Sequence, residues 1–369
     1  MKSTPFYTRL AHVLISIICL FYIAIIGQTV LAPLLFALLF SLLLLPFANF
    51  LEQKFRMPRA LSSIAVLVVL STLILGVILL LLSQLTDLSD DFPAFKQQLL
   101  IATESIQDWV SNTFKINNSQ QVDYINTATS DALSQGGTLI GHTILSISSL
   151  MLSLIFIFLY TFCILVYRKL LLRFAISLFS EEHTAIVYDV VAQIRYIVKK
   201  YIAGLFIQML VVTLLSCIAF EVIGIKYAIL LGLITGIFNI IPYIGIFTSL
   251  LITVLITFAT MGNTEVLFVV LSVTGIHLVD GNYIMPKVVG SKVRINTFAA
   301  LIGLVIGELV WGIKGMFLSI PILAICKIIF DRVEGLHPWG LILGEEEIAP
   351  STLETVTIPE KTQPKDELE

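Results

Sequence analysis

The stretch "GIFNIIPYIGIF", residues 236–247, interrupts one of the most apolar parts of the chain. Asn239, Pro242 and Gly245 all weaken a helix, yet the flanking residues are almost entirely Leu, Ile, Val and Phe. Irregular backbone in an apolar environment needs new hydrogen-bond partners, because no water is there to supply them. The break therefore marks a place where a helix ends inside an apolar region, and the surrounding sequence decides what that region is.

The composition around this break is that of a membrane protein. Of the 369 residues, 57% are hydrophobic and only 13% are charged, whereas soluble domains have about 25% charged residues. Apolar runs of roughly 17 to 25 residues, the length that crosses a hydrocarbon core, recur along the chain. These features predict an all-α polytopic membrane protein with about eight membrane helical elements.

Lys and Arg residues gather in alternate gaps between the apolar runs. They are concentrated at the N-terminus and in residues 51–60, 168–200 and 286–296. By the positive-inside rule these segments are cytoplasmic, so both termini are expected in the cytoplasm. Residues 84–140 hold seven acids and two lysines and are placed outside. An apolar stripe predicts a small extracytoplasmic helical region there, with a disordered loop as the alternative.

The predicted organisation has five parts. They are N-terminal transmembrane helices at 1–83, the extracytoplasmic helical region at 84–140, transmembrane helices with a cytoplasmic loop (168–200) at 141–223, a motif-rich transport half at 224–335, and a cytoplasmic acidic tail at 336–369. The tail is rich in acids and proline and is predicted to be disordered.

Two helical hairpins are predicted in the motif-rich half. Residues 227–262 must leave the outer face and return to it, which gives two arms of about 22 and 25 Å joined at "IIPYIG". Residues 297–330 give a similar pair, entered from the opposite face and joined at "WGIKG". Each pair is either a re-entrant hairpin with its tip in the membrane or two ordinary spans with a tight turn.

Polar groups at the first break are candidates for binding a substrate or an ion. Asn239 and Pro242 place an amide and freed carbonyl groups together, and such groups can bind a polar solute or a small cation. Tyr243 could close the site by stacking, and Gly245 completes the candidate set at this tip. The alternatives are a turn-forming Asn and a Tyr that lies at a membrane interface.

Ionisable residues in the later apolar helices are the second group of candidates. Glu308 could carry a proton or bind Na⁺, or it could pair with Lys314 at the second tip. Asp280, beside Asn282, has either an ion or proton role or the role of a solvated helix end. His277 could titrate near neutral pH, or it could be a hydrogen-bonded packing residue.

Glycine and proline residues form an expected structural motif. Its members are Gly232, Gly236, Pro286, Gly290, Gly303, Gly307, Gly312, Gly315 and Pro321. Two GxxxG pairs favour close helix contact and make a homo-oligomer plausible. The glycines on either side of Lys314 permit a tight tip.

The sequence contains no HExxH, GxSxG or Walker A pattern, so we do not expect an enzyme or an ATP-driven pump. The four cysteines lie singly in apolar segments without metal-ligand spacing, and neither a metal site nor a cofactor is expected. The expected partners are a small molecule or ion and the lipid bilayer, and not nucleic acid. Na⁺ or H⁺ is the candidate coupling ion.

Three segments together resemble the signature half of the autoinducer-2 exporter family, also called PerM-type permeases. They are "NIIPYIG" (239–245), "VDGNYIMPKVVG" (279–290) and "GLVIGELVWGIKGMFLSIPILAICKIIF" (303–330), and the resemblance covers roughly residues 10–335. It implies a transport protein of the bacterial inner membrane that exports autoinducer-2 or, as some members do, exchanges Na⁺ or Li⁺ for H⁺. His277 and Asp280, Asn296-Thr297, and Glu308 differ from the residues usual in the family, which bears on the substrate rather than the fold.

The leading hypothesis is a secondary transporter that exports a small polar solute, an autoinducer-2-like signal by the resemblance. Its substrate would lie between the two hairpin tips, and an ion gradient or the substrate's own gradient would drive transport. A Na⁺(Li⁺)/H⁺ antiporter is the alternative within the transport class. A membrane scaffold that transports nothing is the alternative from another class.

Overall fold

Helices are the only regular elements in the part of the chain that the computed structural model describes, residues 6–90, 97, 101, 151–242, 244–288 and 295–345. The labelled helices are α1 Phe6–Ile26, α2 Gln28–Lys54, α3 Arg59–Asp90, α6 Thr184–Ile223, α7 Ala228–Phe238, α8 Ile244–Thr260, α9 Asn263–Val279, α10 Met285–Val288, α11 Thr297–Trp311, α12 Ile313–Arg332 and α13 His337–Leu343. A further helix is Met151–Ser177. The prediction of an all-α protein is confirmed.

Six of the described helices are long and apolar enough to cross a membrane. They are Gln28–Lys54, Arg59–Leu88, Met151–Ser177, Thr184–Ile223, Thr264–Val288 and Ile313–Arg332. Four shorter apolar helices accompany them: Leu10–Ile26, α7, α8 and α11. Large apolar side chains point outward, as at Ile18 and Leu20, each 66% exposed. Such wide apolar surfaces fit contact with lipid.

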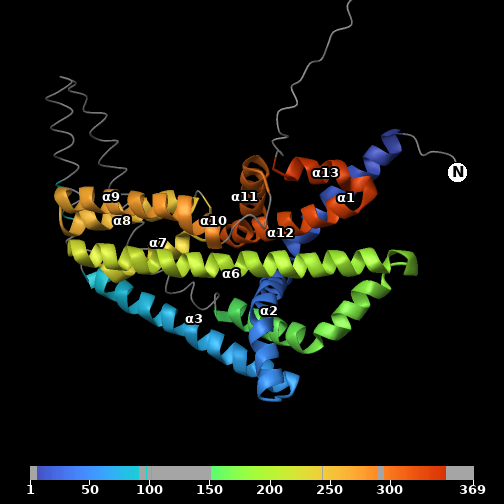
Figure 1. Cartoon of the computed structure of the whole chain (residues 1–369). Helices are drawn as coiled ribbons and strands as arrows, with labels where there is room; N and C mark the ends of the chain where they lie inside the picture. The colour runs from blue at the N-terminus through green and yellow to red at the C-terminus, as the bar shows by residue number, and fades with distance from the viewer. Residues whose placement is uncertain are drawn as a thin grey trace, which may run out of the picture.

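The 40-residue helix α6 runs through the middle of the molecule (Figure 1). Along one half of α6 lie α7, α8 and α9, while α11, α12 and α13 lie toward its other end (Figure 1). The sequence predicts a loop at residues 168–200, but the helix Met151–Ser177 runs into this segment and α6 begins at Thr184. The basic residues of this segment therefore lie on helices. The part of the predicted transmembrane region that follows it, residues 201–223, is the second half of α6.

Three apolar clusters hold the helices together. The first joins α2, α6 and α12 through residues such as Leu42, Ile202 and Leu318. The second joins the far end of α6 to α7 and α9, with Phe220 and Leu231 fully buried. The third joins α2, α3 and the helix Met151–Ser177. Because α6 contributes to the first two clusters, the region between them lies in the interior beside α6.

The GxxxG glycines face helices of the same chain. A Cβ atom added at Gly236 would collide with Thr213 and would lie 2.9 Å from the Met209 carbonyl oxygen on α6. A Cβ atom at Gly307 or Gly315 would collide with the backbone of the facing helix, so α11 and α12 also pack closely there. Since these surfaces are occupied within the chain, the glycine pairs give no support to the predicted homo-oligomer.

The first part of the predicted disordered tail is helical instead. Residues 337–343 form α13, and the Lys327 ammonium on α12 donates to the Gly340 carbonyl. The Asn296 amide donates to the carbonyls of Ile342 and Gly344, at 2.5 and 2.8 Å. These bonds hold the end of α13 against the start of α11. Residues 346–369 lie outside the described residues, as do the predicted extracytoplasmic residues 102–140.

Candidate functional site

A buried carboxylate, Asp280, is the centre of the candidate site. Asp280 follows the last residue of α9 and is only 5% exposed. Its Oδ2 atom accepts hydrogen bonds from Gln208 Nε2 on α6 at 2.8 Å and from Asn239 Nδ2 at the end of α7 at 3.0 Å. We call Gln208, Asn239 and Asp280 the Asp280 cluster. A solvated helix end, one of the two alternatives for Asp280, is wrong because the carboxylate is enclosed by other elements.

The first break in the sequence positions Asn239. Asn239 is the C-cap of α7, and its backbone N–H donates to the Thr235 carbonyl. Pro242 cannot extend the helix, and α8 begins two residues later at Ile244. A Cβ atom at Gly245 would collide with the Phe238 carbonyl, so the start of α8 lies directly against the end of α7. Tyr243 lies outside the described residues.

A π-helical turn positions Asp280 itself. Residues Asp280–Ile284 form a π-helix between α9 and α10, and the Met285 N–H closes it by donating to the Asp280 carbonyl. Pro286 follows immediately, and its ring would clash with the carbonyl of Asn282 in a regular helix. The wider turn avoids this clash. Isolated π-turns occur often at functional sites because they redirect side chains.

Polar atoms near the cluster lack hydrogen-bond partners among the described residues. They are Asp280 Oδ1 and both ring nitrogens of His277, all of them buried. His277 precedes Asp280 by three residues, so the two belong to the same helical face. Leaving a buried polar group unpaired costs about 1–3 kcal/mol, and more for a charged one. The cluster therefore has unused capacity to bind a proton, a cation or a polar solute.

The surroundings of the cluster are apolar. Leu205, one turn before Gln208 on α6, belongs to the first apolar cluster, and Leu231, two turns before Asn239, belongs to the second. Within a membrane-spanning protein, a carboxylate in such a place is costly and usually serves transport or ion binding. Because the helix breaks at Asn239 and Asp280 meet at this carboxylate, irregular backbone and charge coincide there.

The other predicted site residues lie elsewhere. Glu308 and Lys314 are both exposed, and within the described residues no ion pair joins them. Asn282 is exposed and donates to the Leu278 carbonyl on its own helix at 2.7 Å. Gly290 lies outside the described residues. Among the described residues, the structure thus brings Asn239 and Asp280 together, with His277 about one helical turn before Asp280.

Two residues with structural roles are not among the candidates predicted from the sequence, Gln208 at the Asp280 cluster and Trp311 at the second predicted tip. Gln208 supplies half of the donors to Asp280, and the only signal for it is a single amide within the apolar run "GLFIQMLVV" at 204–212. Trp311, at the end of α11, donates from Nε1 to the Ala24 carbonyl on α1 at 2.9 Å. This bond ties the second predicted tip to the first helix.

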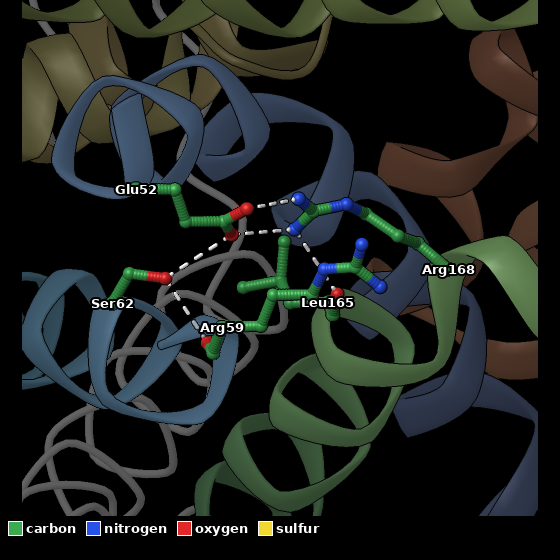
Figure 2. Close-up of polar contacts among 5 residues, drawn as sticks. All are labelled: Glu52, Arg59, Ser62, Leu165 and Arg168. Carbon is green, nitrogen blue, oxygen red and sulfur yellow. Dashed lines mark hydrogen bonds and ion pairs between the residues drawn. The ribbon is translucent and has the colours of Figure 1, made fainter. Parts of the chain in front are cut away.

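A second polar cluster, also not expected from the sequence, joins three helices far from Asp280. The Glu52 carboxylate on α2 receives two hydrogen bonds from the Arg168 guanidinium, at 2.6 and 3.0 Å (Figure 2). Ser62 on α3 donates to Glu52 Oε1 at 3.2 Å. The side chains of Arg168 and Glu52 are 18% and 16% exposed. This two-pronged ion pair fixes the ends of α2, α3 and the helix Met151–Ser177 relative to one another.

Long apolar helices, wide apolar surfaces and a buried carboxylate at two helix breaks together define a multi-pass membrane protein of the transporter class. The chain matches the AI-2E family transporter description over residues 14–335, and it belongs to this family. It is therefore a transporter-family protein and not an enzyme, as the sequence predicts.

Two of the relatives described here match over most of their length, and a third matches over about a third of its length. The "Putative transport protein YrrI" of Bacillus subtilis is 28% identical over 82% of this chain and 86% of its own length. The "AI-2 transport protein TqsA" of Escherichia coli is 23% identical over 86% of this chain and 90% of its own length. The "Putative transport protein YhhT" of Escherichia coli is 26% identical over 34% of this chain.

Proposed function

We propose that this protein is a secondary transporter that exports a small polar solute across the bacterial cytoplasmic membrane, with the Asp280 cluster as its substrate or ion site. The observation that carries the proposal is the Asp280 carboxylate. One of its oxygens is held by two amide donors, while the other is buried without a donor among the described residues. A carboxylate held in place but not saturated can bind and release a polar group or a cation.

The short helices around the cluster support a site at membrane depth. The eleven residues of α7 span about 16 Å, which is well short of a hydrocarbon core of about 30 Å. We infer that α7–α8 and α11–α12 are re-entrant hairpins that enter from opposite faces, with both termini cytoplasmic and with α12, which is itself long enough to cross a membrane, as the long arm of the second hairpin. Ile240 at the first break and Trp311 at the second pack against the same apolar cluster, which agrees with tips that approach one another.

The class of solute follows from the relatives. TqsA is named an AI-2 transport protein, so an autoinducer-2-like signal is the first solute to test. Amide and carboxylate groups can accept hydrogen bonds from the hydroxyl groups of a small polar molecule. The apolar surroundings of the cluster would strengthen these bonds.

Exchange of Na⁺ or Li⁺ for H⁺ is the second candidate function. Asp280 Oδ1, which has no donor among the described residues, and the nearby His277 ring favour it, because both can exchange a proton for a cation or a hydrogen bond. In this case Asp280 takes the coupling role for which both Asp280 and Glu308 are candidates in the sequence. Glu308 is exposed and has no partner among the described residues that would place it in the same path.

Flux measurements in proteoliposomes test the proposal. Asp280→Asn keeps the size of the side chain and removes its charge, so we expect flux to fall by about tenfold or more. The matched control is Glu308→Gln, which also removes one carboxylate and should retain nearly normal flux. Labelled autoinducer-2 and radiolabelled Na⁺ under a pH gradient are measured separately, so that the lost flux tells the two candidates apart.

Two results would contradict the proposal. Normal flux of both probes in Asp280→Asn would remove the Asp280 cluster from the transport path. Absence of any flux in the unmodified protein, with correctly folded protein in the liposomes, would favour a membrane scaffold that transports nothing.

A further inference from the structure

A cavity of about 210 Å³ lies between α2, the helix Met151–Ser177 and α6, separate from the Asp280 cluster. Its walls are mostly leucine and isoleucine, and they include Leu38, Leu42, Leu171 and Leu172. The hydroxyl of Ser41, the single uncharged polar side chain in the lining, already donates to the Leu38 carbonyl at 2.7 Å. Apart from two arginines, the lining therefore has no polar side chain left to bind a ligand, and the interior of the cavity suits an apolar ligand.

Two arginines, Arg168 and Arg195, form the charged part of this cavity. Arg168 is engaged by Glu52, which balances its charge. Arg195 is half-buried, and in the described part of the chain it makes no ion pair. The nearest acid along α6, Asp189, pairs instead with Arg332 on α12. The cavity thus joins an apolar interior to a guanidinium group that is free to bind an anion.

Additional positive charge surrounds this end of the cavity. The Arg59 side chain extends toward the Glu52–Arg168 pair (Figure 2). Lys169 and Arg173 follow in the adjoining sequence, in the segment where basic residues gather. Near the cavity, Glu52 therefore balances the charge of Arg168, with Arg59 close by, while Arg195 has no acidic partner among the described residues. Such basic pockets between membrane helices, on the side where Lys and Arg are in excess, suit anionic lipid headgroups.

We propose that this cavity binds one acyl chain of an anionic phospholipid, whose phosphate group is held by Arg195. A guanidinium matches the geometry of phosphate oxygens and binds them through two parallel hydrogen bonds. The cavity is smaller than the roughly 300–1,000 Å³ of most pockets for small molecules. A single hydrocarbon chain suits such a narrow apolar space, while the second chain and the glycerol remain in the bilayer.

This lipid would lie between α2 and the N-terminal half of α6 and would fill the space that separates them. Since α6 also carries Gln208, lipid occupancy would stabilise the helix that supports the Asp280 cluster. The lipid site does not depend on the proposed transport function, because its residues are distinct from those of the cluster.

Native mass spectrometry of the full-length protein in neutral detergent tests the proposal. The protein is incubated with an equal mixture of phosphatidylglycerol and phosphatidylcholine, and the bound lipids are counted. We expect preferential retention of phosphatidylglycerol and a loss of about tenfold in its retention by Arg195→Gln, because one charge-assisted contact to phosphate is removed. Arg195→Lys should recover part of the binding.

Matched variants separate the cavity from general surface charge. Lys199→Gln removes one positive charge from the same helix outside the cavity lining and should leave retention unchanged. Ala175→Phe fills the cavity while keeping both arginines, and it should also reduce retention. Thermal unfolding without added lipid shows whether each variant is folded.

Three outcomes would overturn the proposal. They are equal retention of the two lipids, an equal loss in Lys199→Gln and Arg195→Gln, and normal lipid retention in a folded Ala175→Phe variant. Protection from thermal unfolding by inorganic phosphate as strong as that by phosphatidylglycerol would instead assign Arg195 to a small-anion site without a lipid chain.

Discussion

At the residue scale, the protein places its buried charges in two different ways. The Glu52 carboxylate is neutralised by Arg168 and receives a further hydrogen bond from Ser62. Asp280, by contrast, is held only by two neutral amides and has one oxygen without a donor among the described residues. A saturated ion pair contributes to a fixed structure, whereas an unsaturated carboxylate can change its ligand.

The Glu52–Arg168 pair is expected to stabilise the folded protein. Arg168→Gln leaves a largely buried carboxylate with a weaker partner, and we expect it to lower the free energy of unfolding by about 2 kcal/mol. The measurement is denaturant or thermal unfolding in detergent. Lys169→Gln, the exposed neighbour, is the control and should change stability little.

The double variant Glu52→Gln/Arg168→Gln sharpens this test. It removes both charges and should be more stable than Arg168→Gln alone, because no buried charge is left unpaired. A stability loss in the double variant equal to the sum of the losses in Arg168→Gln and Glu52→Gln, each measured alone, would show that the pair does not interact energetically.

At the element scale, the packing of α7 on α6 brings Asn239 to Gln208 and Asp280. The glycines of α7 allow this contact, since a Cβ at Gly232 would collide with Cys217 and one at Gly236 with Thr213. The break after α7 and the π-helical turn after α9 then aim two side chains at the same point. Neither element would form the cluster without the other.

Gly236→Ala tests this close approach. The added methyl group forces α7 away from α6, and we expect a loss of about 2 kcal/mol in stability together with weaker transport. Gly275→Ala on α9 is the matched control, because a Cβ there meets nothing within 4 Å. The control should be neutral or slightly stabilising, by up to about 1 kcal/mol. Equal effects of the two substitutions would argue against close packing as the role of Gly236.

At the scale of the whole molecule, the depth of the second tip decides between re-entrant hairpins and full spans. Gly312 separates α11 from α12, and Lys314 follows it as an exposed residue. Within the membrane a lysine is costly, while at a surface turn it is solvated. The accessibility of position 314 to a reagent in water therefore reports the depth of this tip.

Cysteine labelling measures that accessibility. In a background without the four native cysteines, Lys314→Cys should react slowly with an impermeant thiol reagent added outside, because the proposed tip is buried in the membrane. Met261→Cys, in the turn between α8 and α9, is the accessible control, since this turn is expected at the outer face. Labelling of both positions at the same fast rate would support two full spans in place of a re-entrant hairpin.

The sequence by itself determined the class of protein and the location of its helix breaks. Apolar run lengths predict the long helices because a hydrocarbon core demands them, and Asn239, Pro242 and Pro286 predict interruptions because they cannot continue a regular helix. Local patterns of this kind carry no information on which breaks meet. Glu308 is therefore as good a candidate as Asp280 in the sequence. Gln208 is a single amide among apolar neighbours, and no local pattern marks it as a site residue.

Only the tertiary structure decided which polar groups share a site. Asn239 and Asp280 are 41 positions apart, and Gln208 and Asp280 are 72 apart, yet all three meet at one carboxylate oxygen. The pairing of Glu52 with Arg168, across 116 positions, is equally invisible in the sequence. The physical reason is that contacts between helices depend on how each helix is rotated and where glycine allows close approach, and these are properties of the packed molecule.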